Sequence, residues 1–373
     1  MPKRILRVVA VPFLLTAFLQ LPAQHATEKK PAVWFPNQPA PSGSSYVGHK
    51  RCAECHASEA ANQARGAMAG ALAPANASPV LRARPRLAMR RGPYSYQITR
   101  SRNQVVYRVS DGTRSLDAPL LWAFGEGKVG QTFVFRHAGD YWESRVSYYH
   151  RLGGLDFTVG TARQPETLEE AFGRRLSPAD ARDCFGCHAT GAVVSGRLEA
   201  EAATAGVRCE ACHGPGSAHI QAVRSGVAES RIFNPAVLNS DDQSQQFCGS
   251  CHRSWSTVME MPDRGGLDNV RFQPYRIFHS PCYSMDDARI RCVTCHDPHA
   301  PLGTAAASYD AKCLACHATA RNARTALRHA PPCPVGVREC VNCHMPKVEL
   351  SSAHFKFTDH RIRVVRAGDK YPN

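Results

Sequence analysis

Hydrophobic residues near the N-terminus form a mostly apolar run from Val8 to Leu21, preceded by three basic residues. Small residues follow at Ala23 and Ala26, and this order of basic, apolar and small residues is typical of a secretory signal peptide. The run is shorter than the roughly 20 apolar residues that a membrane-spanning helix needs. We therefore predict a signal peptide over residues 1–26, with an uncleaved anchor as the alternative.

Apolar and polar residues alternate between Tyr94 and Thr158. The short runs YSYQIT, QVVYRV, TFVFRH and YWESRVSYY are separated by Gly, Asp and Asn residues. A period of two residues indicates half-buried strands, and the separating residues favour turns. We predict a small antiparallel β insert that carries Trp122 and Trp142 and serves as a scaffold, with partner docking as the alternative.

The spacing of the cysteines indicates covalent binding of a cofactor, because the pentapeptide Cys-x-x-Cys-His occurs seven times. This pentapeptide is the attachment signal for c-type haem: its cysteines bind one porphyrin, and its histidine is the proximal ligand of the iron. The predicted attachment cysteines are Cys52, Cys55, Cys184, Cys187, Cys209, Cys212, Cys248, Cys251, Cys292, Cys295, Cys313, Cys316, Cys340 and Cys343. The predicted proximal ligands are His56, His188, His213, His252, His296, His317 and His344.

The sequence thus predicts seven covalently attached haem c groups. Zinc knuckles or ribbons are the alternative, but zinc sites do not require a histidine directly after every second cysteine. All seven motifs have that histidine. Assembly of such a protein would depend on the cytochrome c maturation machinery.

Six motifs lie between Cys184 and His344, at about 27 residues per motif, which is too little chain for a separate side-chain core around each porphyrin. We therefore expect the haems to form the core. The predicted fold class is a mainly α and irregular multihaem cytochrome c fold, with short helices around stacked haems and a small antiparallel β insert. The predicted parts are the signal peptide 1–26, a Pro/Ser-rich leader 27–45, a haem 1 module 46–90, a haem-free β-rich insert 91–165 and a hexahaem module 166–373.

Histidines outside the motifs determine how many irons have two protein ligands. Apart from His25, the chain has His49, His137, His150, His219, His279, His299, His329, His354 and His360. His219 and His299 follow motif histidines by six and three residues, so neither segment easily reaches round its own porphyrin. We predict that each binds the iron of a neighbouring haem. His354, His360 and His329 are further candidate distal ligands.

The other side chains that could bind iron have competing interpretations. His137 and His150 lie among strand-like aromatic residues, where an ordinary hydrogen-bonded histidine is the favoured interpretation, and His49 and His279 stay open. Met68 follows the first motif by twelve residues. Its thioether is a candidate distal ligand of haem 1 that would raise the reduction potential, with simple packing as the alternative.

Two cysteines lie outside the motifs, Cys282 and Cys333. In an oxidising compartment they are predicted to form a disulfide, with a free thiol or a thiolate ligand as alternatives. The formal net charge of +15 comes from scattered basic residues rather than a basic stripe, so no nucleic-acid partner is expected. We predict a periplasmic protein, soluble or membrane-associated, whose partners are periplasmic or membrane-bound redox proteins; the oligomeric state stays open.

Five segments, in order, carry a family resemblance: Tyr46-Val-Gly before Cys52, CEACHGPGSAH ending at His219, CVTCHDPH ending at His299, CVNCHMPK ending at Lys347, and FTDHRI ending at Ile362. In these segments the chain resembles bacterial multihaem c-type cytochromes related to the tetrahaem electron acceptor of hydroxylamine oxidoreductase. The resemblance implies bis-histidine haems in closely stacked pairs, with His219, His299, His354 and His360 at positions that supply distal ligands. It also implies respiratory or detoxifying electron transfer.

The resemblance leaves two classes of function. The predicted function is electron transfer between redox partners through closely packed, mostly six-coordinate haems, in which no residue is catalytic. The alternative is an oxidoreductase that acts on a small nitrogen or sulfur compound, of the nitrite, hydroxylamine or tetrathionate type, at one open haem. Related reductases often carry Lys in place of the motif histidine at the catalytic haem, and all seven motifs here end in His.

Overall fold

The computed structural model describes residues 34–36, 38, 40, 43–161, 164–227, 231–261, 265–285, 289–317, 333–366 and 368–372. The predicted signal peptide and the candidate ligand His329 lie outside these residues. No helix among the described residues is both long enough and apolar enough to cross a membrane.

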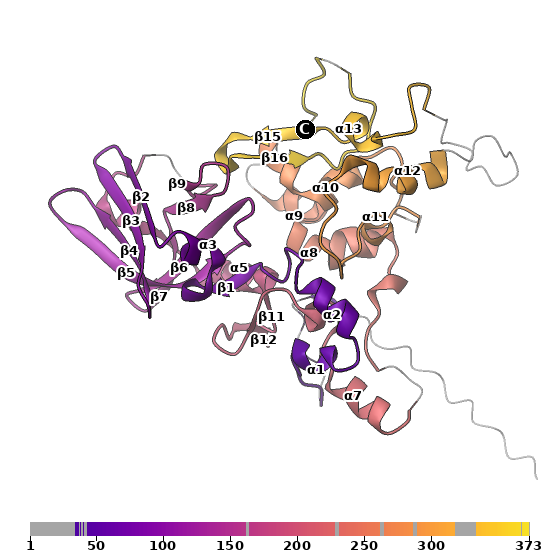
Figure 1. Ribbon diagram of the computed structural model, residues 1–373, viewed down its shortest axis with the longest axis horizontal. Helices are drawn as coiled ribbons and strands as arrows, with labels where there is room; N and C mark the ends of the chain where they lie inside the picture. The colour runs from indigo at the N-terminus through magenta and orange to yellow at the C-terminus, as the bar shows by residue number, and fades with distance from the viewer. Residues whose placement is uncertain are drawn as a thin grey trace, which may run out of the picture. The chain divides into compact units, whose positions relative to one another are not determined.

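A ten-stranded antiparallel sheet extends from residue 72 to residue 175 (Figure 1). The strands are β1 (Leu72–Pro74), β2 (Arg86–Arg91), β3 (Tyr94–Arg100), β4 (Val105–Ser110), β5 (Ser115–Phe124), β6 (Gly130–His137), β7 (Asp140–Ser144), β8 (Val146–Tyr149), β9 (Gly154–Phe157) and β10 (Gly173–Arg175). Their order is β10-β7-β6-β5-β4-β3-β2; β1 pairs with β5, and β8 pairs with β6 and β9.

The alternation along the strands explains the core of this sheet. Tyr96 in β3, Tyr107 in β4 and Phe133 in β6 are fully buried, while their neighbours along each strand are more exposed in β3 and β4. Helix α4 (Leu168–Phe172) contributes Phe172, whose ring lies parallel to that of Tyr107 at a centroid distance of 5.4 Å. Side chains therefore fill this interior without help from another group.

The predicted fold class is wrong in its proportions, because the β part is a large half-barrel sheet rather than a small insert. The sheet also extends beyond residues 91–165 at both ends. Strand β2 has the sequence RLAMRR, whose arginines are exposed at a sheet edge, and β5 contains Pro119 and a register shift after Leu120. Arginine and proline obscure the alternation that identified the other strands.

Short helices carry the cysteine motifs, and loops and turns connect them (Figure 1). The helices are α1 (His49–Ala53), α2 (Ala57–Gln63), α3 (Pro79–Ala83), α5 (Pro178–His188), α6 (Cys209–His213), α7 (Ser217–Arg224), α8 (Gly249–His252), α9 (Trp255–Glu260), α10 (Gln273–Phe278), α11 (Cys292–Cys295), α12 (Asp310–His317) and α13 (Cys340–His344). Each of the seven motifs overlaps one of them. The hairpin of β15 (Lys347–Leu350) and β16 (Phe355–Thr358) follows the last motif.

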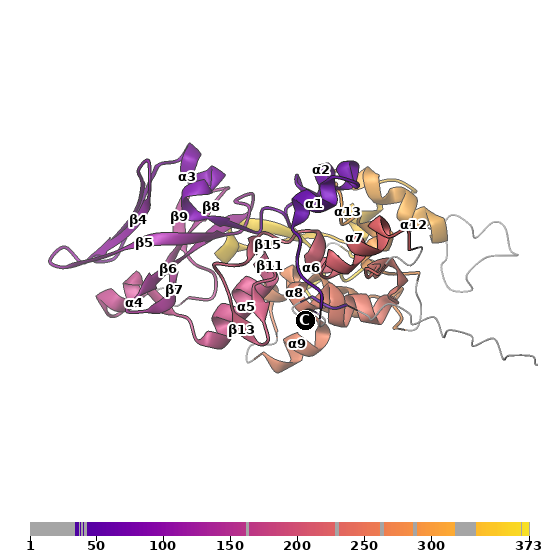
Figure 2. The same ribbon diagram turned by 90° about the horizontal axis from the view of Figure 1, so that it is seen from below.

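Helix α5, which carries the second motif, packs directly on the sheet (Figure 2). Phe185 of α5 is fully buried and contacts Trp122, Phe124 and Tyr141 at centroid distances of 5.7, 5.1 and 5.6 Å. The other two hydrophobic clusters are much smaller. They consist of Trp34, Phe233, Leu238 and Phe247, and of Val258, Phe272 and Tyr275.

Candidate haem-binding sites

Helices α5, α6, α11, α12 and α13 each contain both cysteines of a motif. In α6, for example, Cys209 and Cys212 are three residues apart and His213 ends the helix. Residues three apart on a helix are neighbours on its surface, so the two thiols lie where a single planar group can reach both. No three Cys, His, Asp or Glu side chains converge on one point among the described residues, as a zinc site would require.

Backbone carbonyls orient the imidazoles of three motif histidines. His188 donates through Nδ1 to the carbonyl of Ala71, His213 to that of Phe233, and His344 to that of Arg363, each at 2.9 Å. A nitrogen that donates to a carbonyl carries the proton, so Nε2 keeps its lone pair and is the nitrogen available to a metal. Burial lowers the pKa of His188 and of His213, which favours this neutral form.

Three motif histidines each lie opposite a histidine that the sequence predicts to be a distal ligand. The ring centroids are 6.5 Å apart for His56 and His219, 5.9 Å for His213 and His299, and 6.1 Å for His296 and His360. In a bis-histidine site, each imidazole nitrogen would lie about 2 Å from the iron and about 1.1 Å from the centroid of its own ring. The two ring centroids would then be roughly 6 Å apart. The separation of these rings therefore fits one iron between the two imidazoles of each pair.

This spacing also falls in the range of ordinary aromatic pairs. The identity of the partners distinguishes the two interpretations, because each pair joins a motif histidine to a predicted distal histidine. His360 also donates through Nδ1 to the carbonyl of Thr358 at 3.0 Å, which leaves its Nε2 as the ligating nitrogen. The residues present thus fit a haem at the first, third and fifth motifs.

The remaining predicted ligands are placed differently. His354 contacts Asp156 of the sheet through Nε2 at 2.8 Å, and its ring lies against Tyr149 at 5.0 Å. In this arrangement Nε2 of His354, the nitrogen that would bind iron, is hydrogen-bonded to the carboxylate of Asp156. Met68 lies on a turn after α2 rather than on a helix, and its carbonyl accepts from the backbone N–H of Val207 at 2.9 Å.

His279, which the sequence leaves open, has a buried Nε2 with no hydrogen-bond partner among the described residues. Its ring packs edge-on against Tyr275 and Phe278. Burial, and then the nearby charge of Arg361, lowers the pKa of His279. A buried acceptor without a partner is unusual, so His279 is an additional candidate ligand. His137, by contrast, packs edge-on against the aromatic rings of Trp142 and Phe172.

Thiols of different motifs face one another. Cys52 faces Cys209, Cys187 faces Cys251, and Cys248 faces Cys292. These contacts raise the pKa of the first thiol in each pair and lower that of the second, to about 7 for Cys209 and Cys251. The first motif therefore lies beside the third, the second beside the fourth, and the fourth beside the fifth.

The two cysteines outside the motifs do not form the predicted disulfide in the structure. Cys282 and Cys333 are both free and both exposed. Burial, and then Cys316, raises the pKa of Cys282, whereas backbone N–H groups of Gly336 and Val335 lower that of Cys333.

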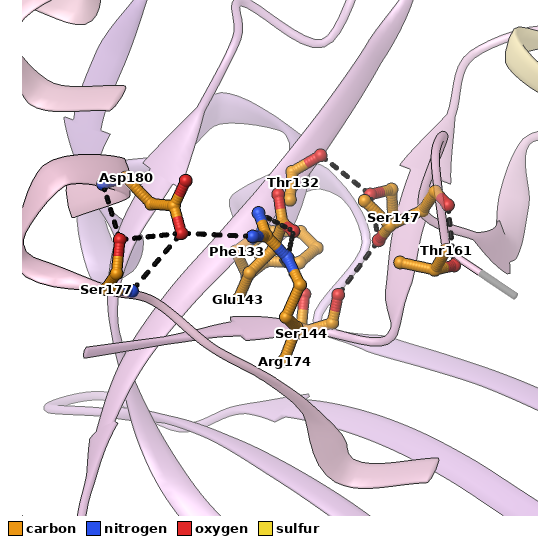
Figure 3. Close-up of polar contacts among 10 residues, drawn as sticks. Thr132, Phe133, Glu143, Ser144, Ser147, Thr161, Arg174, Ser177 and Asp180 are labelled. Carbon is orange, nitrogen blue, oxygen red and sulfur yellow. Dashed lines mark hydrogen bonds and ion pairs between the residues drawn. The ribbon is translucent and has the colours of Figure 1, made fainter. Parts of the chain in front are cut away.

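An ion-pair network fixes the start of α5 to the sheet (Figure 3). Arg174 of β10 donates to Glu143 of β7 from Nε at 3.2 Å and from Nη2 at 3.1 Å, and Nη1 lies 3.4 Å from Asp180. Ser177 and Asp180 form a capping box at the N-terminus of α5. Burial raises the pKa of Glu143, although Arg174 opposes this shift. The helix with the second motif is thus held at its start by charges and at Phe185 by packing.

Haem-attachment motifs on short helices, with histidines paired across them, define the class of multihaem c-type cytochromes. A family model described as "Cytochrome c554 and c-prime" matches residues 159–214. The chain is also similar to the "Multiheme cytochrome MtrA" of Shewanella baltica (strain OS185), with 26% identity over 200 residues, or 50% of this chain and 52% of that protein. The chain thus spans about half the length of this curated relative. No solved structure matches the chain significantly. Both similarities support a multihaem c-type cytochrome.

Proposed function

We propose that the protein is a periplasmic cytochrome with seven haem c groups, which transfers electrons between redox partners. The observation that carries this proposal is the pairing of motif histidines with distal histidines at 5.9–6.5 Å. An iron with an imidazole on each face has no position left for a substrate, so such a site changes its oxidation state without making or breaking bonds. The bound haem supplies this reversible one-electron chemistry.

The chain's own residues hold and orient the group at each site. Two cysteines fix the porphyrin edge of each motif, and the pairs His56 and His219, His213 and His299, and His296 and His360 would hold three of the irons. Carbonyl groups fix the tautomer of two of these imidazoles, His213 and His360. For the other irons the available candidates are His279, His329, His354 and Met68.

The distal histidines also interlock the motifs. His219 belongs to the segment after the third motif and lies opposite the first, and His299 belongs to the segment after the fifth motif and lies opposite the third. Each pair therefore connects two motifs, and the facing thiols connect others. Electron transfer over short steps needs such closely packed sites, which supports a chain of carriers rather than isolated centres.

The proposed location rests on the predicted signal peptide and on the similarity to a protein named as a multihaem cytochrome. Periplasmic or membrane-bound redox proteins are the proposed partners. We propose no catalytic residue.

Electron paramagnetic resonance of the oxidised holoprotein, with a haem-to-protein ratio measured alongside, tests this function. We expect seven haems per chain and low-spin ferric signals. A high-spin signal near one haem per molecule that nitrite, hydroxylamine or cyanide perturbs would overturn the proposal. That result would instead support an oxidoreductase acting on a small nitrogen or sulfur compound at an open haem.

A further inference from the structure

One buried carboxylate lies between two candidate haem ligands near the C-terminus. Asp359 has a fully buried side chain and accepts from Arg276, with Nε 2.8 Å from Oδ1 and Nη2 3.0 Å from Oδ2. It also accepts from Arg363 Nη1 at 2.6 Å and from the backbone N–H of Arg361 at 3.0 Å. Both carboxylate oxygens are therefore satisfied by donors from two elements far apart in the sequence.

Arg276 is as buried as its partner. Its side chain is 0% exposed, its Nη1 donates to the carbonyl of Pro372 at 2.9 Å, and its guanidinium lies 4.6 Å from the ring centroid of Tyr371. Arg276 and Asp359 thus form a buried, two-bond ion pair in which the two charges compensate each other.

The segment that follows Asp359 contains one candidate ligand, His360, and contacts a second, His344. His360, the next residue, lies opposite His296 at 6.1 Å, and its carbonyl accepts from Ser280 Oγ at 3.0 Å. Arg363 accepts from His344 Nδ1 at 2.9 Å through its carbonyl, and its N–H donates to the His344 carbonyl at 3.2 Å. A movement of Asp359 would therefore reach a ligand of the fifth motif and a ligand of the seventh.

We propose that Asp359 is a positioning residue that, through Arg276 and Arg363, sets the orientation of His360 and of His344. This inference rests on the proposed function, because it takes His360 to be a haem ligand. Loss of a carboxylate that only stabilised the fold would leave Arg276 buried without its partner and destabilise the chain, but it would not change the ligands of the haems. The electron paramagnetic resonance spectrum of the holoprotein therefore distinguishes a positioning role from a purely structural one.

The test is Asp359→Asn in the holoprotein. The carboxamide keeps the shape but turns an N–H group toward one of the arginine donors, so the fork from Arg276 is broken. We expect seven haems per chain, with shifted g-values for two low-spin haems or conversion of up to one haem to high spin. Shifted reduction potentials of the same haems are expected in a redox titration. Asp111→Asn is the control, because Asp111 likewise accepts from backbone N–H groups and contacts an arginine, in a turn of the sheet without candidate ligands.

His360→Ala separates failure of this inference from failure of the proposed function. If His360→Ala leaves every haem low-spin, His360 is not a ligand. That result overturns both the proposed ligand role of His360 and the positioning role of Asp359. If His360→Ala yields a high-spin haem while Asp359→Asn has wild-type g-values and potentials, only the positioning role is overturned. Should Asp359→Asn not yield holoprotein, Arg363→Gln replaces it, because that side chain is 17% exposed and its backbone contacts to His344 remain. An unchanged spectrum of Arg363→Gln would also overturn the positioning role.

Discussion

The sheet and the motif-bearing region fill their interiors with different material. The sheet has one continuous cluster of twenty buried hydrophobic residues, among them several aromatic rings in contact. Among the described residues, the two clusters away from the sheet and α5 contain only four and three buried residues. Many buried side chains there are polar instead, including Gln243, Asn269, Arg276 and Asp359.

This difference shows which part of the chain depends on an added group. A sheet with its own aromatic core has enough buried apolar area to fold by itself. The motif helices have between four and eleven residues and little shared apolar surface, and isolated helices of that length are marginal in water. We infer that the motif region is completed by the haems attached to its cysteines, whereas the sheet is complete without them.

The largest expected effect comes from withholding the haems. When the chain is produced without cytochrome c maturation, we expect the region after residue 208 to be digested rapidly by protease, while residues 72–175 resist. Mass spectrometry of the fragments, with far-UV circular dichroism of the product, measures this difference. Equal protection of both regions in the haem-free protein would show that the motif region does not need the haems to fold.

A cavity in the sheet core should have a large effect on the sheet and none on the haems. Phe172 is 1% exposed and contacts Tyr107 and Phe135, so Phe172→Ala is expected to lower the free energy of unfolding of the sheet by about 3–5 kcal/mol. Haem content and spin state should stay as in the wild type. Denaturation followed by circular dichroism and by haem absorbance separates the two readouts.

Leu152→Ala is the control for that variant. Leu152 is 50% exposed, so its truncation should change stability by no more than about 0.5 kcal/mol. If Phe172→Ala lost low-spin haem signal and Leu152→Ala did not, the core of the sheet would affect the haem sites. The sheet and the motif-bearing region would then not be independent.

The strands that the sequence predicts and those that it misses differ in one physical respect. The runs at Tyr94 and at residues 104–109 alternate, those at residues 132–137 and 141–149 are rich in aromatic and β-branched residues, and β3, β4, β6, β7 and β8 form there. In strand β2 the exposed arginines and Ala88 obscure the alternation of Leu87 and Met89, and β5 is interrupted by Pro119. The size of the sheet therefore follows from pairing between strands, which a single-strand pattern does not contain.

The candidate haem sites likewise have a part that the sequence predicts and a part that it does not. The spacing of Cys and His identifies the attachment residues, because both lie within one helical turn. The contacts that orient the ligands are long-range: Arg276 and Asp359 are 83 residues apart, and His354 and Asp156 are 198 apart. The segment FTDHRI stands out in the sequence, but only the fold shows that its aspartate meets a buried arginine.

Removing a distal histidine should change one haem and leave the sheet intact. In His219→Ala and in His299→Ala we expect one low-spin haem to become high-spin, because each imidazole faces a different motif histidine. Low-temperature electron paramagnetic resonance measures the change. His137→Ala is the matched control, since His137 packs against Trp142 and Phe172. A spectrum identical to that of the wild type would remove the substituted residue from the ligand set.

The smallest expected effect concerns Glu143, the carboxylate that ties the sheet to the helix of the second motif. Its folded-state pKa is raised by burial, so the folded chain binds the proton more tightly than the unfolded chain, whose value is about 4.3. The contribution of this group to stability is therefore present at pH 4 and is lost as the pH rises through the folded pKa. In Glu143→Gln this loss is absent, so the stability of the variant relative to the wild type should increase from pH 4 to pH 7.

We expect this change to stay within about 1 kcal/mol, because Arg174 is 49% exposed and keeps a hydrogen-bond acceptor in the variant. Urea denaturation at several pH values, followed by circular dichroism of the sheet, measures it. Asp117→Asn serves as the control, since Asp117 is an exposed carboxylate on the same sheet, 3.9 Å from Arg108. Parallel pH curves for Glu143→Gln and the wild type would show that Glu143 is ionised as easily as in the unfolded chain.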